Sequence, residues 1–154
     1  MNRLFIVFLL ACCSHITAQE TTAVPFAILE QVPVYPGCRG DNLQLKACMS
    51  KSIQRFVNEN FDLELVQNLG LPEGRHRLAA QFQISATGTI ENVMIRGDYL
   101  QVNQELERVI KLIPNMQPGY QDGEAVAVNY SLPVLFAIAP DPDKKKKKHK
   151  KKNS

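Results

Sequence analysis

Two cysteines, Cys38 and Cys48, are the residues of this 154-residue chain whose type and spacing best predict a specific chemistry. They lie ten positions apart, and a disulfide that closes such a loop stabilises a protein by about 2.5–3 kcal/mol. A zinc site would need more ligands, and His76 is the only histidine between the N-terminal segment and the lysine-rich end. We therefore predict a Cys38–Cys48 disulfide, no metal site and no cofactor.

Side chains that could catalyse a reaction are few and poorly spaced. His76 stands between two arginines, with no Ser, Cys or carboxylate at the spacing of a nucleophile and its base, so we expect a solvated histidine at a strand edge. Glu105 and Glu107 are two positions apart on a predicted helix, which places them on different faces. The glycines form no phosphate-binding loop. The sequence thus predicts no catalytic residues and no enzyme.

The first 18 residues have the pattern of a secretory signal peptide. Arg3 supplies a positive charge, an apolar run of ten covers residues 4–13, and small residues precede Gln19. The run is too short for a membrane-spanning helix, which needs about 20 apolar residues. We therefore expect a mature chain that begins near Gln19 and acts in the periplasm or outside the cell.

A second processing route stays open at Cys12. Residues 9–12, Leu-Leu-Ala-Cys, resemble a bacterial lipoprotein cleavage box, after which Cys12 would carry the lipid anchor. Cleavage after Ala18 leaves an even pair of cysteines, whereas lipidation at Cys12 leaves Cys13 unpaired in an oxidising compartment. The cysteine count therefore favours the signal peptide over the lipid anchor.

The formal net charge of +3 hides two opposite regions. Residues 144–152 contain eight lysines and no acidic residue, while residues 19–143 contain 9 basic and 15 acidic residues, a net charge of −6. We expect residues 140–154 to be a disordered tail. It either keeps the protein soluble or tethers it to an anionic membrane surface, with about 1 kcal/mol for each lysine near the surface. It lacks aromatic residues for base stacking, so nucleic acid is not an expected partner.

Two amphipathic helices are predicted from apolar residues at helical spacing. Residues 45–60 form the first, and residues 61–69 add either a short helix or an irregular link. Residues 102–113 form the second, with Asn103 as a candidate cap and Pro114 as the stop.

Three strands are predicted around the second helix. Residues 77–85 and 90–96 form a hairpin, with a bulge near Glu91 or Asn92 because the apolar residues there change parity. Residues 126–138 alternate strictly and form the last strand. Ahead of them, residues 19–31 are a polar lead-in and residues 32–37 an extended edge or lid.

The element order predicts an α+β domain over residues 32–139. A small three-stranded sheet with two helices packed on one face would bury every apolar stripe. A mature chain of this length would bury about two thirds of its unfolded surface, enough to fold independently.

Three motifs follow one another along the predicted strands and the second helix. They are Phe82, Gln83, Ile84, Gly88, Ile90, Val93 and Ile95; Leu106, Val109, Ile110, Pro114, Met116, Pro118 and Gly119; and Val126, Val128, Tyr130, Leu132, Pro133, Val134 and Phe136. In this order they resemble the C-terminal domain of TonB-family proteins, in the form common in Bacteroidetes. The start Pro36-Gly37-Cys38, with a second cysteine ahead of a helix, is similar to a subgroup of that family. The resemblance covers roughly residues 30–138.

The resemblance implies a periplasmic binding domain that docks on an outer-membrane transporter, whose peptide adds a strand to the edge of the sheet. Such binding uses the unpaired backbone groups of an edge strand. Residues 124–132 are the predicted edge, since Pro133 has no amide hydrogen and suits an edge strand. The residues free to meet a partner would be Glu124, Ala125, Ala127, Asn129 and Ser131.

The chain departs from the family in two respects. It shows no membrane anchor and no long Pro-rich spacer, so we expect a stand-alone envelope protein that cannot carry force from the inner membrane by itself. Phe61-Asp62 replaces the family's usual Tyr-Pro near the end of the first helix. The alternative function is that of a structural or surface-association protein, a homodimer that self-pairs through its sheet edge and is tethered by its lysine tail.

Overall fold

The computed structural model describes residues 23–139. The predicted signal peptide, Cys12 and the lysine-rich tail lie outside these residues. No helix within residues 23–139 is long and apolar enough to cross a membrane.

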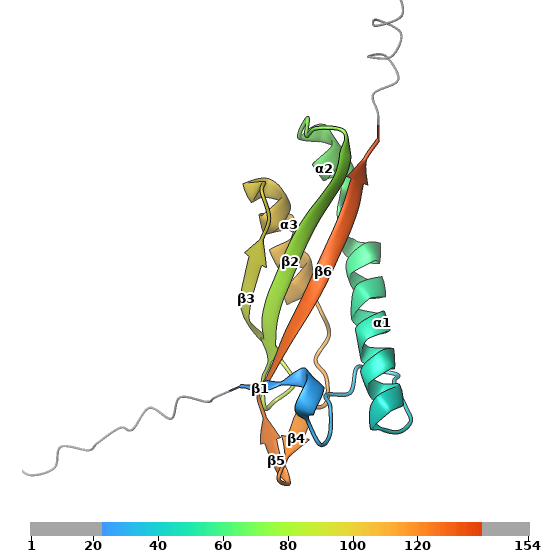
Figure 1. The fold of residues 1–154 in the computed structure, drawn as a ribbon, viewed down its shortest axis with the longest axis vertical. Helices are drawn as coiled ribbons and strands as arrows, with labels where there is room; N and C mark the ends of the chain where they lie inside the picture. The colour runs from blue at the N-terminus through green and yellow to red at the C-terminus, as the bar shows by residue number, and fades with distance from the viewer. Residues whose placement is uncertain (1–22, 140–154) are drawn as a thin grey trace, which may run out of the picture.

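A four-stranded sheet forms the centre of the α+β fold, with the strand order β1-β6-β2-β3. The long strands β2 (Gly74–Ile84) and β6 (Val128–Ile138) pair antiparallel over their full length. β3 (Ile90–Arg96) continues the sheet on one side, and β1 (Val24–Pro25) adds two parallel residues on the other (Figure 1). The prediction of a three-stranded sheet is therefore correct for β2, β3 and β6, but it omitted β1.

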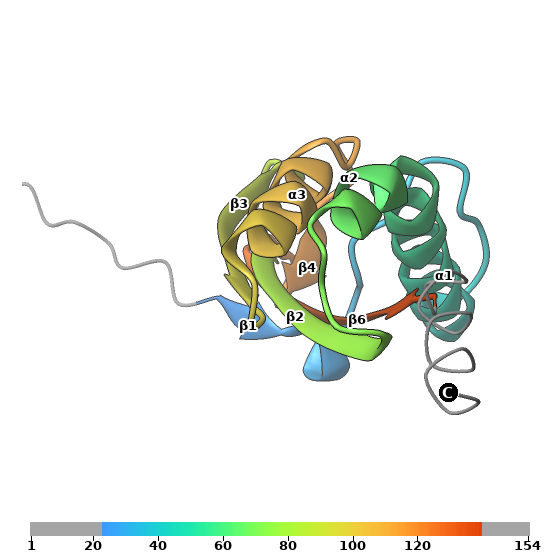
Figure 2. The same cartoon turned by 90° about the horizontal axis from the view of Figure 1, so that it is seen from above.

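Three α-helices lie on one side of this sheet (Figure 2). Two of them were predicted, and the third is the short helix that was one of two alternatives for residues 61–69. α1 (Asn42–Asn60) lies beside β6, α2 (Leu63–Asn68) follows it, and α3 (Leu100–Lys111) lies nearer β3. A short 3₁₀ helix, η1 (Phe26–Ile28), follows β1. No α-helix of the described residues lies on the opposite face of the sheet.

α1 begins earlier than its apolar pattern indicated. The Asp41 carboxylate accepts a hydrogen bond from the Gln44 backbone N–H at 2.8 Å, and the Gln44 side chain accepts one from the Asp41 N–H at 3.1 Å. This capping box satisfies two donors that a helix N-terminus leaves free, so the helix starts at Asn42. Its apolar stripe of Met49, Ile53 and Val57 is buried.

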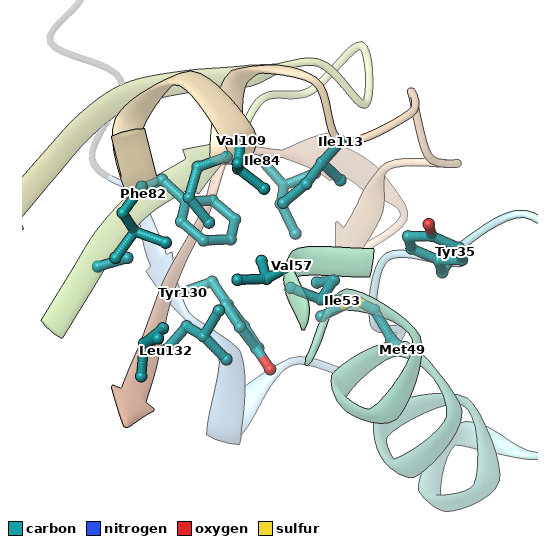
Figure 3. Close-up of a cluster of buried hydrophobic side chains, with 14 of the residues drawn as sticks. Tyr35, Met49, Ile53, Val57, Phe82, Ile84, Val109, Ile113, Tyr130 and Leu132 are labelled. Carbon is teal, nitrogen blue, oxygen red and sulfur yellow. The ribbon is translucent and has the colours of Figure 1, made fainter. Parts of the chain in front are cut away.

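The core lies between the helices and the inner face of the sheet. Along β6, the even-numbered side chains from Val128 to Phe136 are buried and the odd-numbered ones are exposed. They meet alternate residues of β2 and the stripes of α1 and α3 (Figure 3). The predicted period-two alternation is confirmed from residue 128 onward.

The last strand was predicted to begin at Val126, two residues too early, because Val126 belongs to a separate hairpin. β4 (Gly119–Gln121) and β5 (Glu124–Val126) pair antiparallel around Asp122 and Gly123, whose φ angles of 53° and 77° suit a tight turn. β6 then begins at Val128. The segment predicted as an edge or lid bridges to the same region through Gln31–Tyr120 and Val34–Gln117 and is packed, with Val32 fully buried.

The hairpin of β2 and β3 contains the predicted bulge. The register shifts opposite Gln81 and Gln83, and Asn92 has a positive φ of 51°. The predicted cap of α3 is wrong: Tyr99 precedes the helix, and Asn103 lies inside it with its side-chain amide donating to the Gly97 carbonyl at 3.0 Å.

Candidate functional site

The two sides of β6 differ in how they are paired. On one side, β2 pairs with every residue from Val128 to Ile138. On the other side, β1 pairs only with Val128 and Asn129. Residues 130–138 therefore form an edge with no neighbouring strand in the part of the chain that the structure describes; we call this stretch the open edge.

The direction of the backbone groups along the open edge follows from one hydrogen bond. The Val24 N–H donates to the Ala127 carbonyl at 2.8 Å, so the Ala127 backbone faces away from β2. Successive residues of a strand face opposite neighbours, so odd-numbered residues of β6 face outward. Ser131, Leu135 and Ala137 thus present free N–H and C=O groups, and Pro133 presents only a carbonyl.

Pro133 occupies a position where its missing N–H breaks no bond with β2. Proline in a sheet is confined to positions whose N–H would face solvent. Its register partner is Ala79 of β2, within a ladder that runs without interruption past it. Pro133 therefore marks the open side of β6 and removes one donor from it.

The structure moves the candidate edge relative to the predicted one. Glu124 and Ala125 pair with β4 in the separate hairpin, and the Ala127 carbonyl is occupied by β1. Asn129 lies beside β1, and its side-chain amide donates to the Ala23 carbonyl at 3.3 Å. Of the predicted residues, only Ser131 lies on the open edge. The residues that sequence reasoning missed, Leu135 and Ala137, could have been found from the continued alternation beyond Pro133.

A groove runs along the open edge on its helical side. It has a volume of about 180 Å³ and lies between β6 and the junction of α1 and α2. Leu63 and Leu135 keep 45% and 64% of their surface exposed, so the groove is partly apolar and open to solvent. Its lining residues are Val57, Asn58, Phe61, Leu63, Val134, Leu135, Phe136 and Ala137.

Glu105 of α3 fixes the wall of this groove. Its carboxylate accepts hydrogen bonds from the Asp62 N–H at 2.9 Å and from Arg108 at 2.7 and 2.8 Å. Arg108 also donates to the Asn60 carbonyl at 3.0 Å. The hydrogen bond with Arg108 lowers the pKa of Glu105, against the opposing effect of burial. The α1–α2 junction is therefore tied to α3.

Glu107 has a separate role from Glu105, as their spacing predicted. It pairs with Lys111 at 2.6 Å on the exposed side of α3. Glu105 is buried, with 7% of its surface exposed. The two carboxylates thus serve different contacts.

His76 is half-buried and lies in a cluster of rings, a contact that the sequence did not predict. Its ring stacks on Phe136 with centroids 5.1 Å apart and meets Tyr99 edge-on at 5.5 Å. The Nε2 atom lies 2.8 Å from the Pro72 carbonyl. His76 therefore supports Phe136 of the groove lining.

The predicted disulfide between Cys38 and Cys48 is present, with Cα atoms 5.9 Å apart. It ties the loop before α1 to the middle of that helix. Within residues 23–139, no three His, Cys, Asp or Glu side chains are grouped to hold a metal ion.

No protein-family model matches the chain, and no curated protein matches it.

Proposed function

We propose that this protein is a non-enzymatic binding module that takes up an extended segment of another protein as an added strand along β6. The open edge carries this proposal. A strand with a complete ladder on one side and free backbone groups on the other binds an extended peptide through main-chain hydrogen bonds. The adjacent groove would receive every second side chain of the peptide, since side chains alternate along a strand.

The proposed partner is an outer-membrane transporter or another envelope protein. This follows the resemblance to the TonB C-terminal domain, which the element order supports: α1, the β2–β3 hairpin, α3 and β6 occur in the expected sequence. The predicted signal peptide would place the protein in the periplasm. A stretch of the partner that has no fold of its own would then dock on β6.

Pairing of two copies through β6 is the alternative, and Pro133 argues against it. An antiparallel pair of β6 strands centred on Val134 would place each Pro133 opposite Leu135 of the other copy. Such a dimer would lack two backbone hydrogen bonds, one at each Pro133, whereas a complex with a peptide would lack only one. The open edge therefore suits a peptide better than a second copy.

Calorimetric titration of two variants at one position tests the proposal. Leu135→Pro removes an outward N–H, whereas Leu135→Ala removes the side chain and keeps that donor. With extended peptides from the periplasmic N-termini of outer-membrane transporters, we expect at least a tenfold loss of affinity for Leu135→Pro relative to Leu135→Ala, from about 1.4 kcal/mol for one backbone bond and its neighbours. Equal affinities of the two variants would contradict strand addition at this edge.

A further inference from the structure

The face of the sheet that no helix covers carries a cluster of arginines. Arg75 and Arg77 lie on β2 and Arg96 lies on β3, and all three are exposed. They are three of the nine basic residues between positions 19 and 143, a region with a net charge of −6. This concentration on one face of an otherwise acidic body points to an anionic partner.

The register brings the three arginines together. Arg75 and Arg77 are two residues apart on the same face, about 7 Å along the strand. Arg96 is the partner of Ala79, and so lies diagonally from Arg77 at about 7–8 Å. The two ion pairs of α3, Arg108–Glu105 and Lys111–Glu107, include none of these three arginines.

An exposed apolar side chain stands among the arginines. Leu135 of β6 is the register partner of Arg77, and 64% of its surface is exposed. Ala137, the partner of Arg75, also faces outward. We call Arg75, Arg77, Arg96 and Leu135 the cationic face.

The lysine-rich tail comes after β6 in the sequence, and β6 ends beside the start of β2. Ile138, at the end of β6, is paired with Gly74 at the start of β2, next to Arg75. The eight lysines of the tail begin six residues after Ile138 in the sequence. The last residues of β6 and Arg75 therefore lie at the same end of the sheet.

We propose that the cationic face docks on an anionic phospholipid membrane. Guanidinium groups form charge-assisted hydrogen bonds with phosphate oxygens, and each cation near an anionic bilayer adds to binding. Leu135 would enter the boundary between headgroups and acyl chains, as apolar residues of interfacial proteins do. The acidic remainder of the body is repelled by the same surface, which orients the protein with this face toward the lipid.

Nucleic acid fits the cationic face less well. Single strands are held by aromatic rings on which bases stack. The outward-facing side chains of β2, β3 and β6, all within the described residues, include no aromatic ring. The aliphatic Leu135 among the cations suits a lipid surface better.

Membrane docking and the proposed strand addition use different groups of the same sheet. The cationic face consists of side chains that point away from the helices, whereas the open edge consists of backbone groups in the plane of the sheet. Leu135 belongs to both surfaces, because it also lines the groove beside the open edge, so the arginine variants separate the two proposals and variants of Leu135 do not.

Sedimentation of the exported chain with lipid vesicles tests the proposal. The variant Arg75→Gln, Arg77→Gln, Arg96→Gln is compared with a control that removes three charges elsewhere: Arg39→Gln, Lys51→Gln, Arg55→Gln. With phosphatidylglycerol vesicles at low ionic strength, we expect the first variant to bind about 125-fold more weakly than the unchanged chain, since each of its three cations contributes about fivefold. The control should lose less than about threefold, because its charges lie on other surfaces.

Equal losses in the two triple variants would overturn the proposal, since they would show a response to net charge alone. Equal binding of the unchanged chain to phosphatidylcholine vesicles would also overturn it. A third result would overturn the proposal as well: a single-stranded oligonucleotide displaces the protein from vesicles, and the Arg75, Arg77 and Arg96 variant binds that oligonucleotide more weakly than the unchanged chain does.

A fluorescence measurement tests the position of Leu135 directly. The chain contains no tryptophan, so Leu135→Trp introduces a single probe, and Leu112→Trp places one at a leucine that is 53% exposed after α3. With phosphatidylglycerol vesicles, we expect a blue shift of emission and quenching by brominated lipid for Leu135→Trp alone. An unshifted spectrum at position 135, or the same shift at position 112, would contradict the proposed orientation.

Discussion

The two edges of the main sheet differ in their capacity to accept another strand. β6 is eleven residues long, keeps an unbroken register with β2 and has a groove beside it. β3 is seven residues long, and its register with β2 shifts where Asn92 adopts a positive φ. Short, bulged edges resist pairing, because a bulge interrupts the regular spacing of donors and acceptors.

This difference shows which edge of the sheet leaves its backbone N–H and C=O groups available to pair with another strand. The β3 edge is shortened and bent in the way that natural sheets avoid unwanted pairing. The β6 edge carries a single proline and otherwise stays regular. An edge left regular beside a partly apolar groove indicates a binding surface.

The largest expected effect comes from proline on the two sides of β6. Val134 faces β2, where its register partner is Leu78. Val134→Pro removes a ladder bond and should lower the free energy of unfolding by more than about 3 kcal/mol or prevent folding. Leu135→Pro, on the outward side, should cost much less. Urea unfolding measures both, and equal losses would show that the assigned facing of β6 is wrong.

The disulfide is expected to stabilise the helix beside β6. Replacing Cys38 and Cys48 by serine should lower the free energy of unfolding by about 2.5–3 kcal/mol, because the unfolded chain gains freedom. Denaturation of this double variant beside the oxidised protein measures the loss. A loss below about 1 kcal/mol would mean that α1 is held by its core contacts alone.

Glu105 should contribute less than the disulfide and more than Glu107. Glu105→Gln keeps an acceptor for the Asp62 N–H and weakens the bonds from Arg108, so we expect a loss of about 1.5–2 kcal/mol. Glu107→Gln, the matched control, should cost under about 0.5 kcal/mol. Thermal unfolding compares the two, and a cost for Glu107→Gln as large as that for Glu105→Gln would contradict the assigned roles.

The pH dependence of stability gives a second test of Glu105. Its pKa is lowered in the folded protein, so its contribution is complete above the ordinary glutamate pKa and is lost as pH falls through the folded value. The difference in stability between the unchanged protein and Glu105→Gln should therefore shrink on acidification. A difference that stays constant at acidic pH would show that the charge of Glu105 has no part in it.

The smallest expected effect concerns the bulge of β3. Asn92 has a φ of 51°, and its amide donates to the Gln83 side chain at 2.6 Å. Asn92→Ala should cost about 1 kcal/mol, because alanine is strained at positive φ, whereas Asn92→Gly should be nearly neutral. Unfolding curves of the pair decide this, and an Asn92→Ala variant as stable as Asn92→Gly would argue against a strained bulge.

Local patterns in the sequence predicted much of the fold. The alternation over residues 128–138, the parity change near Asn92 and the helical stripe of α1 each reflect burial on one side of an element. The disulfide followed from the number and spacing of the cysteines. These features depend on neighbouring residues along the chain.

Features that depend on distant residues were missed. β1 is two residues long, too short for any alternation, and it pairs with residues more than 100 positions away. The interruption between β5 and β6 at Ala127 arises from the Asp122–Gly123 turn and from the contact with Val24. The apolar pattern of the sequence runs through this position without a change, so it could not reveal the interruption. The predicted edge, residues 124–132, therefore overlaps the open edge only at residues 130–132. Its location required knowledge of what covers each part of β6.

Backbone amide shifts during a peptide titration test the central claim most directly. With residues 19–154 of the chain and an extended peptide from the N-terminus of an outer-membrane transporter, strand addition predicts the largest shifts at the outward amides of Ser131, Leu135 and Ala137. The amides of β3 should change little. Shifts confined to β3 or to the β4–β5 hairpin, or no shifts along residues 130–138 at saturating peptide, would contradict the account.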